Sequence, residues 1–263
     1  MAKMQENAPR VCKNALFEAL SADFDGVCVY AFDEIDSTNT EAKRMVADGF
    51  CGDAIITAKM QTAGRGRMGR SFFSPAQTGA YFSILHTLNT PLCDAVAITS
   101  AAAVAVMRAI RTLTGIQTKI KWVNDLYYND RKVCGILTEA VSVSERSHVI
   151  VGIGINLDTK DFPSELADVA GSLNSHVDAA LLIAEVWREL SVYLNTPTDH
   201  TWITDYRAHS LVLGNPVTWV ANGISHEGIA VSIDEDGALI VRDECGESTR
   251  LHTGEISLKP LKK

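Results

Sequence analysis

The sequence predicts an α/β (α+β) domain followed by a small β-barrel. Strand-like and helix-like segments alternate over residues 27–209, which is typical of a mixed domain with one large core. After Gly214 the segments are short and β-type, and turn-forming pairs separate them. We therefore expect an N-terminal extension with a helix over 1–26, a larger domain over 27–212 and a barrel over 213–263.

The larger domain opens with a strand over 27–32 that leads into a helix. Thr38 and Glu41 have the spacing of a capping box at the start of this helix, and Gly49 suits its end. Alternating and β-branched runs predict the next strands, while the alanine-rich run opened by Asp94 predicts a long buried helix. The further segments are expected as strands over 54–60, 80–88, 118–123, 132–143 and 148–155, and as helices over 94–114, 178–194 and 199–209.

Four short runs predict the strands of the barrel, over 216–220, 224–233, 237–243 and 247–251. They are separated by the pairs Asn222-Gly223, Asp236-Gly237 and Cys245-Gly246. Because Asn, Asp and Gly tolerate positive φ, these pairs favour tight turns between consecutive antiparallel strands.

Composition excludes several classes of protein. The 32 acidic and 24 basic side chains give a net charge of −8, which argues against general nucleic-acid binding. The six cysteines have no C-x-x-C spacing, so we expect free thiols in a reducing cytoplasm, not a zinc site or a disulfide framework. The N-terminus lacks the apolar segment of a signal peptide. The apolar stretch over 95–107 is shorter than the roughly 18 residues that span a bilayer, which predicts a buried helix and no membrane contact.

The loop from Gln61 to Arg70 (QTAGRGRMGR) is rich in glycine and arginine. Gly64, Gly66 and Gly69 form a G-x-G-x-x-G, but Ser-Phe-Phe-Ser-Pro follows where a dinucleotide-binding fold would open a helix. A kinase interpretation fails as well, because the sequence has no H-R-D or D-F-G segment downstream. Glycines permit close backbone approach and guanidinium groups hold phosphate or carboxylate, so the loop predicts an anion site; a solvated surface loop is the alternative.

The segment from Lys121 to Glu139 combines polar residues with two expected strands. Asn124 and Asp125 follow the first strand, and Asn129-Asp130 makes the turn of a hairpin. Lys132 enters the apolar second strand, where a charge is costly unless it meets an anion. A salt bridge to Asp125 or Asp130 and a contact to a ligand are both consistent with this position.

Two further polar motifs lie at the ends of expected elements. DSTN at 36–39 precedes a helix, and its three hydroxyl or amide side chains exceed what capping needs. The surplus is a candidate for binding a polar group at the helix N-terminus. In GIGIN at 152–156, the two glycines weaken a strand but permit close approach of its backbone.

Taken in order, the motifs resemble those of the biotin protein ligases. They are DSTN at 36–39, QTAGRGRMGR at 61–70, KWVND at 121–125, RKVCGIL at 131–137 and GIGIN at 152–156, with a closing GEISL at 254–258. The resemblance runs from residue 27 to the end of the chain. It implies a class II aminoacyl-tRNA synthetase/biotin synthetase-like catalytic domain with an SH3-like C-terminal barrel, which agrees with the change of pattern after Gly214.

The resemblance implies the activity of a biotin–[biotin carboxyl-carrier protein] ligase. Biotin and MgATP would form biotinyl-5′-AMP, and the biotinyl group would then pass to one lysine of the biotin carboxyl carrier protein of acetyl-CoA carboxylase or a related carboxylase. We expect Mg²⁺ to arrive with ATP and not in a protein metal cage. A monomer and a homodimer formed through the sheet both stay open.

The matched positions divide into three groups. The catalytic group is Lys132, Arg67 and Asp125. Biotin binding falls on Ser37, Thr38, Asn39, Gln61, Gly64, Arg65, Gly66, Arg67, Lys132 and Gly135. Binding of ATP and the adenylate falls on Arg65, Arg67, Arg70, Phe72, Lys121, Trp122, Asn124, Lys132 and Asn156. Two roles stay open for Asp125: it orients or deprotonates the acceptor lysine, or it pairs with Lys132.

The chain departs from the family pattern at two positions and in its length. Val123 stands where the family usually has Pro, and Phe72 where it often has Trp. Some bacterial members carry an N-terminal helix-turn-helix domain, but about 26 residues precede the first expected strand here, so we expect no operator binding and no repressor activity. The alternatives are a lipoate or octanoyl transfer enzyme of the related fold, a non-catalytic biotin or nucleotide sensor, and a DNA-binding repressor; each accounts for fewer of the ordered motifs.

Overall fold

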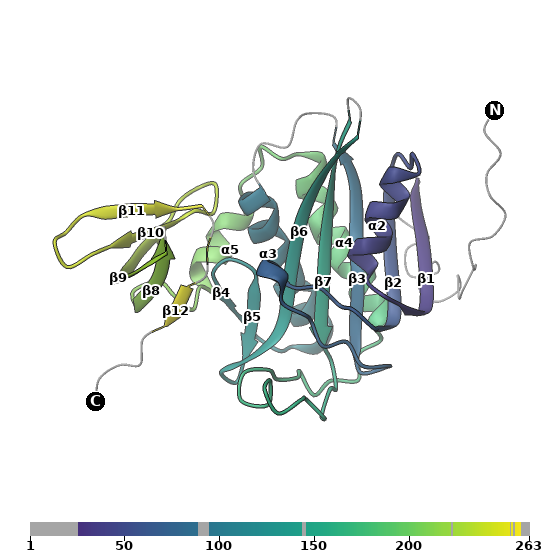
Figure 1. Ribbon diagram of the computed structural model, residues 1–263, viewed down its shortest axis with the longest axis horizontal. Coiled ribbons are helices and arrows are strands. Elements are labelled where there is room, and N and C mark those ends of the chain that lie inside the picture. Colours follow the sequence, from purple (N-terminus) through teal and green to yellow (C-terminus); the bar gives the residue numbers. More distant parts are fainter. Residues whose placement is uncertain are drawn as a thin grey trace.

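A seven-stranded sheet forms the centre of the larger domain (Figure 1). The computed structural model describes residues 26–88, 95–143, 146–221, 223–252, 254 and 256–258. The strand order across the sheet is β1-β2-β3-β7-β6-β5-β4; β1 and β2 pair in parallel, and the other neighbours pair antiparallel. Its strands are β1 (Val27–Ile35), β2 (Asp53–Gln61), β3 (Gly79–Leu88), β4 (Lys119–Lys121), β5 (Asp125–Tyr128), β6 (Arg131–Val143) and β7 (Arg146–Asn156).

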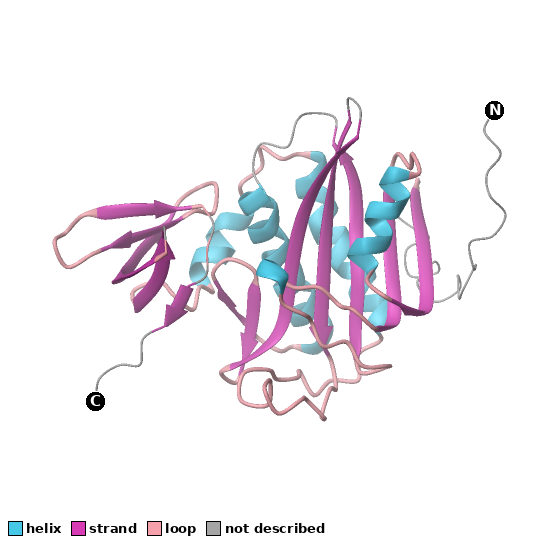
Figure 2. Ribbon diagram, in the orientation of Figure 1, coloured by secondary structure: helices cyan, strands magenta, loops and turns pink. Residues whose placement is uncertain are grey.

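Helices cover the two faces of this sheet unequally (Figure 2). On one face α3 (Ala95–Thr114) and α4 (Ala179–Asn195) pack together, with α5 (Trp202–Ala208) beside α3. On the other face α2 (Thr38–Ala47) packs on β2, β3 and β7. Side chains on β2 alternate between these layers: Ile55 belongs to the core under α3, whereas Ala54 and Ile56 belong to the core under α2. The single short helix leaves part of its face to the loops that follow β2.

Helix α3 is long and apolar enough to cross a bilayer by length and composition. The helix extends to 20 residues and is therefore longer than the apolar stretch over 95–107 from which the sequence excluded a membrane span. Most of these residues are nevertheless buried inside the protein, between the sheet and α4. Burial, not length, identifies it as a core helix.

The C-terminal unit is an antiparallel sheet of five strands in the order β11-β10-β9-β8-β12. They are β8 (Pro216–Ala221), β9 (Ile224–Ile233), β10 (Leu239–Arg242), β11 (Ser248–Leu251) and β12 (Ile256–Leu258). Gly237 (φ 85°) and Gly246 (φ 86°) adopt the left-handed conformation that the predicted turns require. The closing strand β12 was not expected from the sequence, because three residues carry too little periodicity to recognise.

Local details differ from the expected elements in two places. Ser37, and not Thr38, is the N-cap of α2, since its side chain accepts a hydrogen bond from the Thr40 amide. The strand expected over 118–123 ends at Lys121, and Asp125 begins the separate strand β5 where it was expected to follow a strand. The Asn129-Asp130 turn between β5 and β6 is confirmed by positive φ at both residues (49° and 58°). The peptide bond between Trp122 and Val123 is cis.

Several expectations fall on residues outside those that the structure describes. These are the N-terminal helix before residue 26, the opening of α3 at Asp94 and the turn residue Asn222. Among the described cysteines, Cys28, Cys51, Cys134 and Cys245 are free thiols, as the sequence predicted.

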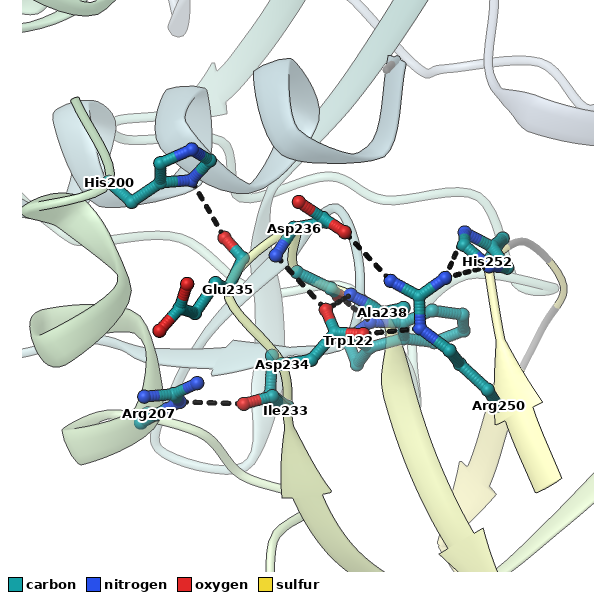
Figure 3. Close-up of polar contacts among 11 residues, drawn as sticks. Trp122, His200, Arg207, Ile233, Asp234, Glu235, Asp236, Ala238, Arg250 and His252 are labelled. Atoms are coloured by element: carbon teal, nitrogen blue, oxygen red, sulfur yellow. Dashed lines mark hydrogen bonds and ion pairs between the residues drawn. The ribbon is translucent and has the colours of Figure 1, made fainter. Parts of the chain in front are cut away.

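The barrel contacts the larger domain through the loop between β9 and β10 (Figure 3). Within this loop Asp234 accepts hydrogen bonds from the amides of Asp236 and Ala238, and Arg250 contacts both aspartates. Three of the carbonyl groups in and beside the loop accept hydrogen bonds from the larger domain. The donors are Trp122 Nε1 to Gly237 at 2.8 Å, His200 Nδ1 to Glu235 at 2.9 Å and Arg207 Nε to Ile233 at 2.6 Å.

Candidate active site

Two adjoining cavities lie where the loop after β2 crosses the sheet beside α2. The small cavity has a volume of about 40 Å³ and is bordered by the N-terminus of α2. The large cavity has a volume of about 250 Å³ and extends from the same loop to β4, β5 and the barrel. Both are lined by Gly66, Arg67, Phe72, Asn124 and Lys132. The two cavities therefore meet at Arg67 and Lys132, the cations singled out from the sequence.

The cavities collect nearly all of the predicted site residues. The residues expected to bind biotin that line the small cavity are Ser37, Thr38, Asn39, Gln61, Arg65, Gly66, Arg67, Lys132 and Gly135. Those expected to bind ATP that line the large cavity are Arg67, Arg70, Phe72, Lys121, Trp122, Asn124, Lys132 and Asn156, and Asp125 lines it too. Gly64 lines neither cavity, and Arg65 borders the small one. A Cβ on Gly64 would lie 2.4 Å from the Phe72 carbonyl, so this glycine permits the loop to pack on itself.

The N-terminus of α2 is bonded to the end of β2. The amide and hydroxyl of Thr38 both donate to Gln61 Oε1, at 2.9 and 3.2 Å. Gln61 Nε2 in turn donates to Ser74 Oγ at 2.9 Å. Ser37 caps the helix, so part of the polar surplus in DSTN orders the site itself.

The contacts of Asn39 with Ser83, Glu139 and Gly152 were not predicted from the sequence. Its Oδ1 accepts a hydrogen bond from Ser83 Oγ at 2.5 Å, and its Nδ2 donates to Glu139 Oε2 at 3.0 Å. A Cβ on Gly152 would lie 2.0 Å from Asn39 Oδ1, so this glycine makes room for the carboxamide. Ser83 within the apolar strand AYFSILHTL was the one local indication of these contacts, since a buried hydroxyl needs hydrogen-bond partners.

Phe72 covers the small cavity from the loop. A Cβ on Gly154 would lie 2.4 Å from its ring, and one on Gly135 would lie 3.1 Å from it. Tyr81 meets the same ring edge-on, with centroids 6.4 Å apart. The sequence predicted that the glycines of GIGIN permit close approach to the strand backbone, and the groups that approach it are the side chains of Asn39 and Phe72.

Lys132 forms the salt bridge to Asp125, which is one of the contacts that the sequence left open. Its Nζ lies 2.7 Å from Asp125 Oδ1, and both side chains are partly buried. The lysine stem passes close to Gly135, where a Cβ would lie 3.1 Å from its Cε. The bulge that the sheet forms between β5 and β6 at Leu126/Tyr127 brings this pair together at the wall of the large cavity.

Two of the three arginines of the loop, Arg65 and Arg67, have partners of different charge. Arg67 donates to Asn124 Oδ1 at 3.0 Å and to the Gly254 carbonyl of the barrel at 2.9 Å. Arg65 makes two parallel contacts with the Glu139 carboxylate, at 3.1 and 3.2 Å. In this structure Arg65 is thus held by a carboxylate of the protein, while the hydrogen-bond partners of Arg67 in the described chain are neutral.

Trp122 and Asn156 both line the large cavity. Trp122 is 3% exposed and donates to Gly237, so it joins the barrel to the site as well as lining the cavity. Asn156 Nδ2 donates to the Gly171 carbonyl at 2.9 Å. Its Oδ1 is buried and has no hydrogen-bond partner among the described residues. An unpaired buried acceptor at a cavity wall favours a ligand that carries an N–H donor.

Comparisons with known proteins assign the chain to a family. The profile of the biotin/lipoate A/B protein ligase family matches residues 31–156, and that of the biotin protein ligase C-terminal domain matches residues 212–259. The bifunctional ligase/repressor BirA of Bacillus spizizenii is 34% identical over 86% of this chain and 72% of its own. The biotin–[acetyl-CoA-carboxylase] ligase of Paracoccus denitrificans is 32% identical over 80% of this chain and 92% of its own. The chain belongs to the biotin protein ligases.

Solved structures of biotin protein ligases agree with this assignment. The ligase from Aquifex aeolicus in complex with biotin and ATP has a TM-score of 0.75 at 28% identity, covering 88% of this chain and 98% of that one. The match to the C-terminal domain of biotin protein ligases separates this chain from the lipoate enzymes of the shared fold. The biotin protein ligase fold, with its C-terminal barrel, and membership of a class of ligase enzymes are thereby established.

Proposed function

We propose that this biotin protein ligase converts biotin and MgATP to biotinyl-5′-AMP and transfers the biotinyl group to a lysine of a biotin carboxyl carrier protein. The observation that carries the proposal is the meeting of the two cavities at Arg67 and Lys132. A carboxylate in one cavity and an α-phosphate in the other would face each other across these two cations. The named acceptor of the Paracoccus relative, acetyl-CoA carboxylase, supports a carrier domain of that or a related carboxylase as the target.

Biotin fits the polar surroundings of the small cavity. Its neutral ureido head has one carbonyl acceptor and two N–H donors, and all three must be satisfied when the head is buried. Ser37, Thr38, Asn39 and Gln61 supply uncharged partners of both kinds. The volume of about 40 Å³ is far below the ~300 Å³ of an ordinary ligand pocket, so we propose that the cavity widens when the ligand enters.

ATP fits the large cavity. Arg67, Arg70 and Lys121 supply positive charge along its wall, which suits phosphates. The unpaired Oδ1 of Asn156 offers an acceptor for an amino group, such as that of adenine. We propose that Mg²⁺ enters as part of the MgATP substrate.

The first step forms a mixed anhydride. A carboxylate oxygen of biotin bonds to the α-phosphorus, the bond from that phosphorus to the bridging oxygen breaks, and pyrophosphate leaves. Two anions must approach each other for this reaction, and positive groups fixed in advance lower its barrier because they need no reorganisation. Arg67 and Lys132 are held for this role by Asn124, Gly254 and Asp125.

The second step transfers the acyl group. The neutral amine of the acceptor lysine attacks the biotinyl carbonyl carbon, AMP leaves, and the amine loses a proton. Asp125 lies at the cavity wall and is the candidate to orient or deprotonate this amine, although it also holds Lys132. We propose that it serves the acceptor once the adenylate has engaged Lys132.

Incubation of the purified chain with ATP, labelled biotin and an acceptor domain tests the function. We expect ATP-dependent labelling of one acceptor lysine, and loss of at least roughly 100-fold in adenylate formation for Lys132→Ala. Lys160→Ala is the matched control, because Lys160 is exposed, pairs with Asp158 and borders neither cavity. Absence of label with the unaltered chain would refute the proposal, and an unaffected Lys132→Ala would refute the site.

Asp125→Asn separates the two roles of this carboxylate. We expect adenylate formation to change less than tenfold and transfer to the acceptor to slow roughly 100-fold, as for loss of a general base. The two half-reactions are measured separately, with isolated adenylate in the second. Loss of adenylate formation with normal transfer would instead assign Asp125 to the positioning of Lys132.

The proposal also covers the domain division of the chain, its location, its oligomeric state and its lack of operator binding. We propose a domain division into 27–212 and 213–263, the first of which holds the catalytic groups. We also propose a cytoplasmic enzyme, a monomer or a homodimer formed through the sheet, and no operator binding, in keeping with the net charge of −8. Fluorescence anisotropy with duplex DNA and light scattering of the purified chain measure the last two properties.

A further inference from the structure

Glu139 on β6 gathers donors from two separate segments of the site. Its carboxylate accepts from Asn39 Nδ2 at 3.0 Å and pairs with Lys43 Nζ at 2.8 Å, both from α2. It also receives both terminal nitrogens of Arg65 from the loop after β2. Glu139 itself lines neither cavity, whereas Asn39 and Arg65 border the small one.

The charges around Glu139 keep it ionised. Burial would raise the pKa of Glu139, but hydrogen bonds from Lys43 and Asn39 and the charge of Arg65 outweigh it and hold the pKa below its usual value. Two cations face one carboxylate here, so Lys43 continues to neutralise Glu139 if Arg65 detaches. Lys43 and Asn39 thus hold the acceptor in place for the loop.

The two-pronged contact with Arg65 fixes the orientation of the loop. An arginine–carboxylate fork is directional as well as charge-assisted, and both partners are partly shielded from water, with 40% and 18% of their side chains exposed. The next residue, Gly66, lines both cavities, and Arg67 follows it at their junction. Holding Arg65 therefore holds the backbone that covers the small cavity.

We propose that Glu139 is a positioning residue for biotin and its adenylate, which fastens the loop at Arg65 and orients Asn39 beneath the ligand. This inference rests on the proposed function. Glu139 touches no reacting atom in it: it acts through Arg65 on the cover of the cavity and through Asn39 on its floor. The loss of Glu139 loosens both, while Arg67, Lys132 and Asp125 keep their own partners.

Glu139→Gln tests this role of Glu139 through three measurements: the KM for biotin, the rate of adenylate release and the proteolysis of the loop. We expect a roughly tenfold rise in KM for biotin and in the rate of biotinyl-5′-AMP release, with a change in kcat of less than threefold, since about 1.4 kcal/mol corresponds to one decade. We also expect faster tryptic cleavage after Arg67, because the loop leaves the sheet more often. Glu185→Gln is the matched control: it removes a carboxylate that pairs with Arg188 on α4 and borders neither cavity, and it should change each value less than threefold.

The double variant decides whether Glu139 acts through Arg65. Arg65→Ala should reproduce the Glu139→Gln effects from an exposed position, and the two changes together should be no worse than either alone. Full additivity, or wild-type KM and proteolysis in both single variants, would overturn the inference. If the unaltered chain makes no adenylate, the proposed function fails. Proteolysis of the same variants still tests whether the contact between Glu139 and Arg65 holds the loop.

Discussion

At the residue scale, three cations of the site have partners in the protein before any ligand arrives. Lys132 pairs with Asp125 and Arg65 with Glu139, so two of the charges are balanced by carboxylates. Arg67 is bonded instead to the neutral oxygens of Asn124 and Gly254. Its charge is oriented without being neutralised by these partners, which leaves it available for a carboxylate or a phosphate. The overall charge of −8 conceals this local site.

Acidification tests the ionised state of Glu139. Because its folded pKa lies below the ordinary 4.5, its contribution to stability is complete above about pH 4.5 and is lost as the pH falls through the lowered pKa. We expect the difference in Tm between the unaltered chain and Glu139→Gln to stay constant from neutral pH down to about pH 5, and to shrink below about pH 4.5. Thermal denaturation over this range measures it. A difference that disappears near neutral pH would contradict the lowered pKa.

At the element scale, β7 shows why glycines stand in a central strand. A Cβ on Gly152 or on Gly154 would lie on the face that carries α2. The missing Cβ of Gly152 leaves room for Asn39, and that of Gly154 leaves room for Phe72. On the opposite face Val151 and Ile153 pack under α3 and α4. The side chains on one face of β7 therefore belong to the apolar core, and the glycines on its other face form the floor of the small cavity.

Gly154→Ala should disrupt the floor of the small cavity. The new Cβ would lie 2.4 Å from the Phe72 ring, and overpacking of this kind costs roughly 1–3 kcal/mol. We expect a lower Tm and weaker biotin binding, measured by thermal denaturation and calorimetry. Phe72→Ala combined with Gly154→Ala is the matched control, since removal of the ring removes the clash. A double variant whose Tm falls by the sum of the two single changes would contradict this account.

At the scale of the whole molecule, the barrel contributes Gly254 and Ile256 to the lining of the large cavity. Trp122, which also lines this cavity, donates to Gly237 of the barrel, and Gly254 accepts from Arg67. The loop that receives Trp122 is itself held by Asp234 and Arg250 (Figure 3). Backbone carbonyls of the barrel thus fix two side chains of the larger domain, so that a shift of the barrel would disturb the large cavity.

Trp122→Phe tests this coupling. The change removes the hydrogen bond to Gly237 and part of a buried ring, for which we expect a loss of about 1–3 kcal/mol in the free energy of unfolding. We also expect KM for ATP to rise roughly tenfold. Trp219→Phe is the control, because Trp219 is buried within the barrel and borders neither cavity. An equal rise in KM for both variants would assign the effect to general destabilisation.

Much of the fold and the site followed from patterns that are local in the chain. The long strands and helices of the larger domain came from their own periodicity, and the Asn129-Asp130 turn from residues that tolerate positive φ. The ordered motifs named most of the polar and charged side chains that line the two cavities, because such residues at the ends of strands stand out against apolar neighbours. They did not name Phe162, Leu166, Val169 and Ala170, which line the large cavity from the segment after β7. The features that were predicted depend on a few adjacent residues, so the sequence alone determines them.

Tertiary structure decided which of those side chains hold one another. Ser83 lies 44 residues from Asn39, Glu139 lies 74 residues from Arg65, and Gly254 lies 187 residues from Arg67. Neither the strand β12 nor the separate strand β5 was recognised, since a strand of three or four residues is defined by its partner and not by its period. The sequence determined the elements and the chemical groups of this ligase; the pairing of those groups depends on sheet register and loop packing, which bring distant residues into contact and leave no local pattern.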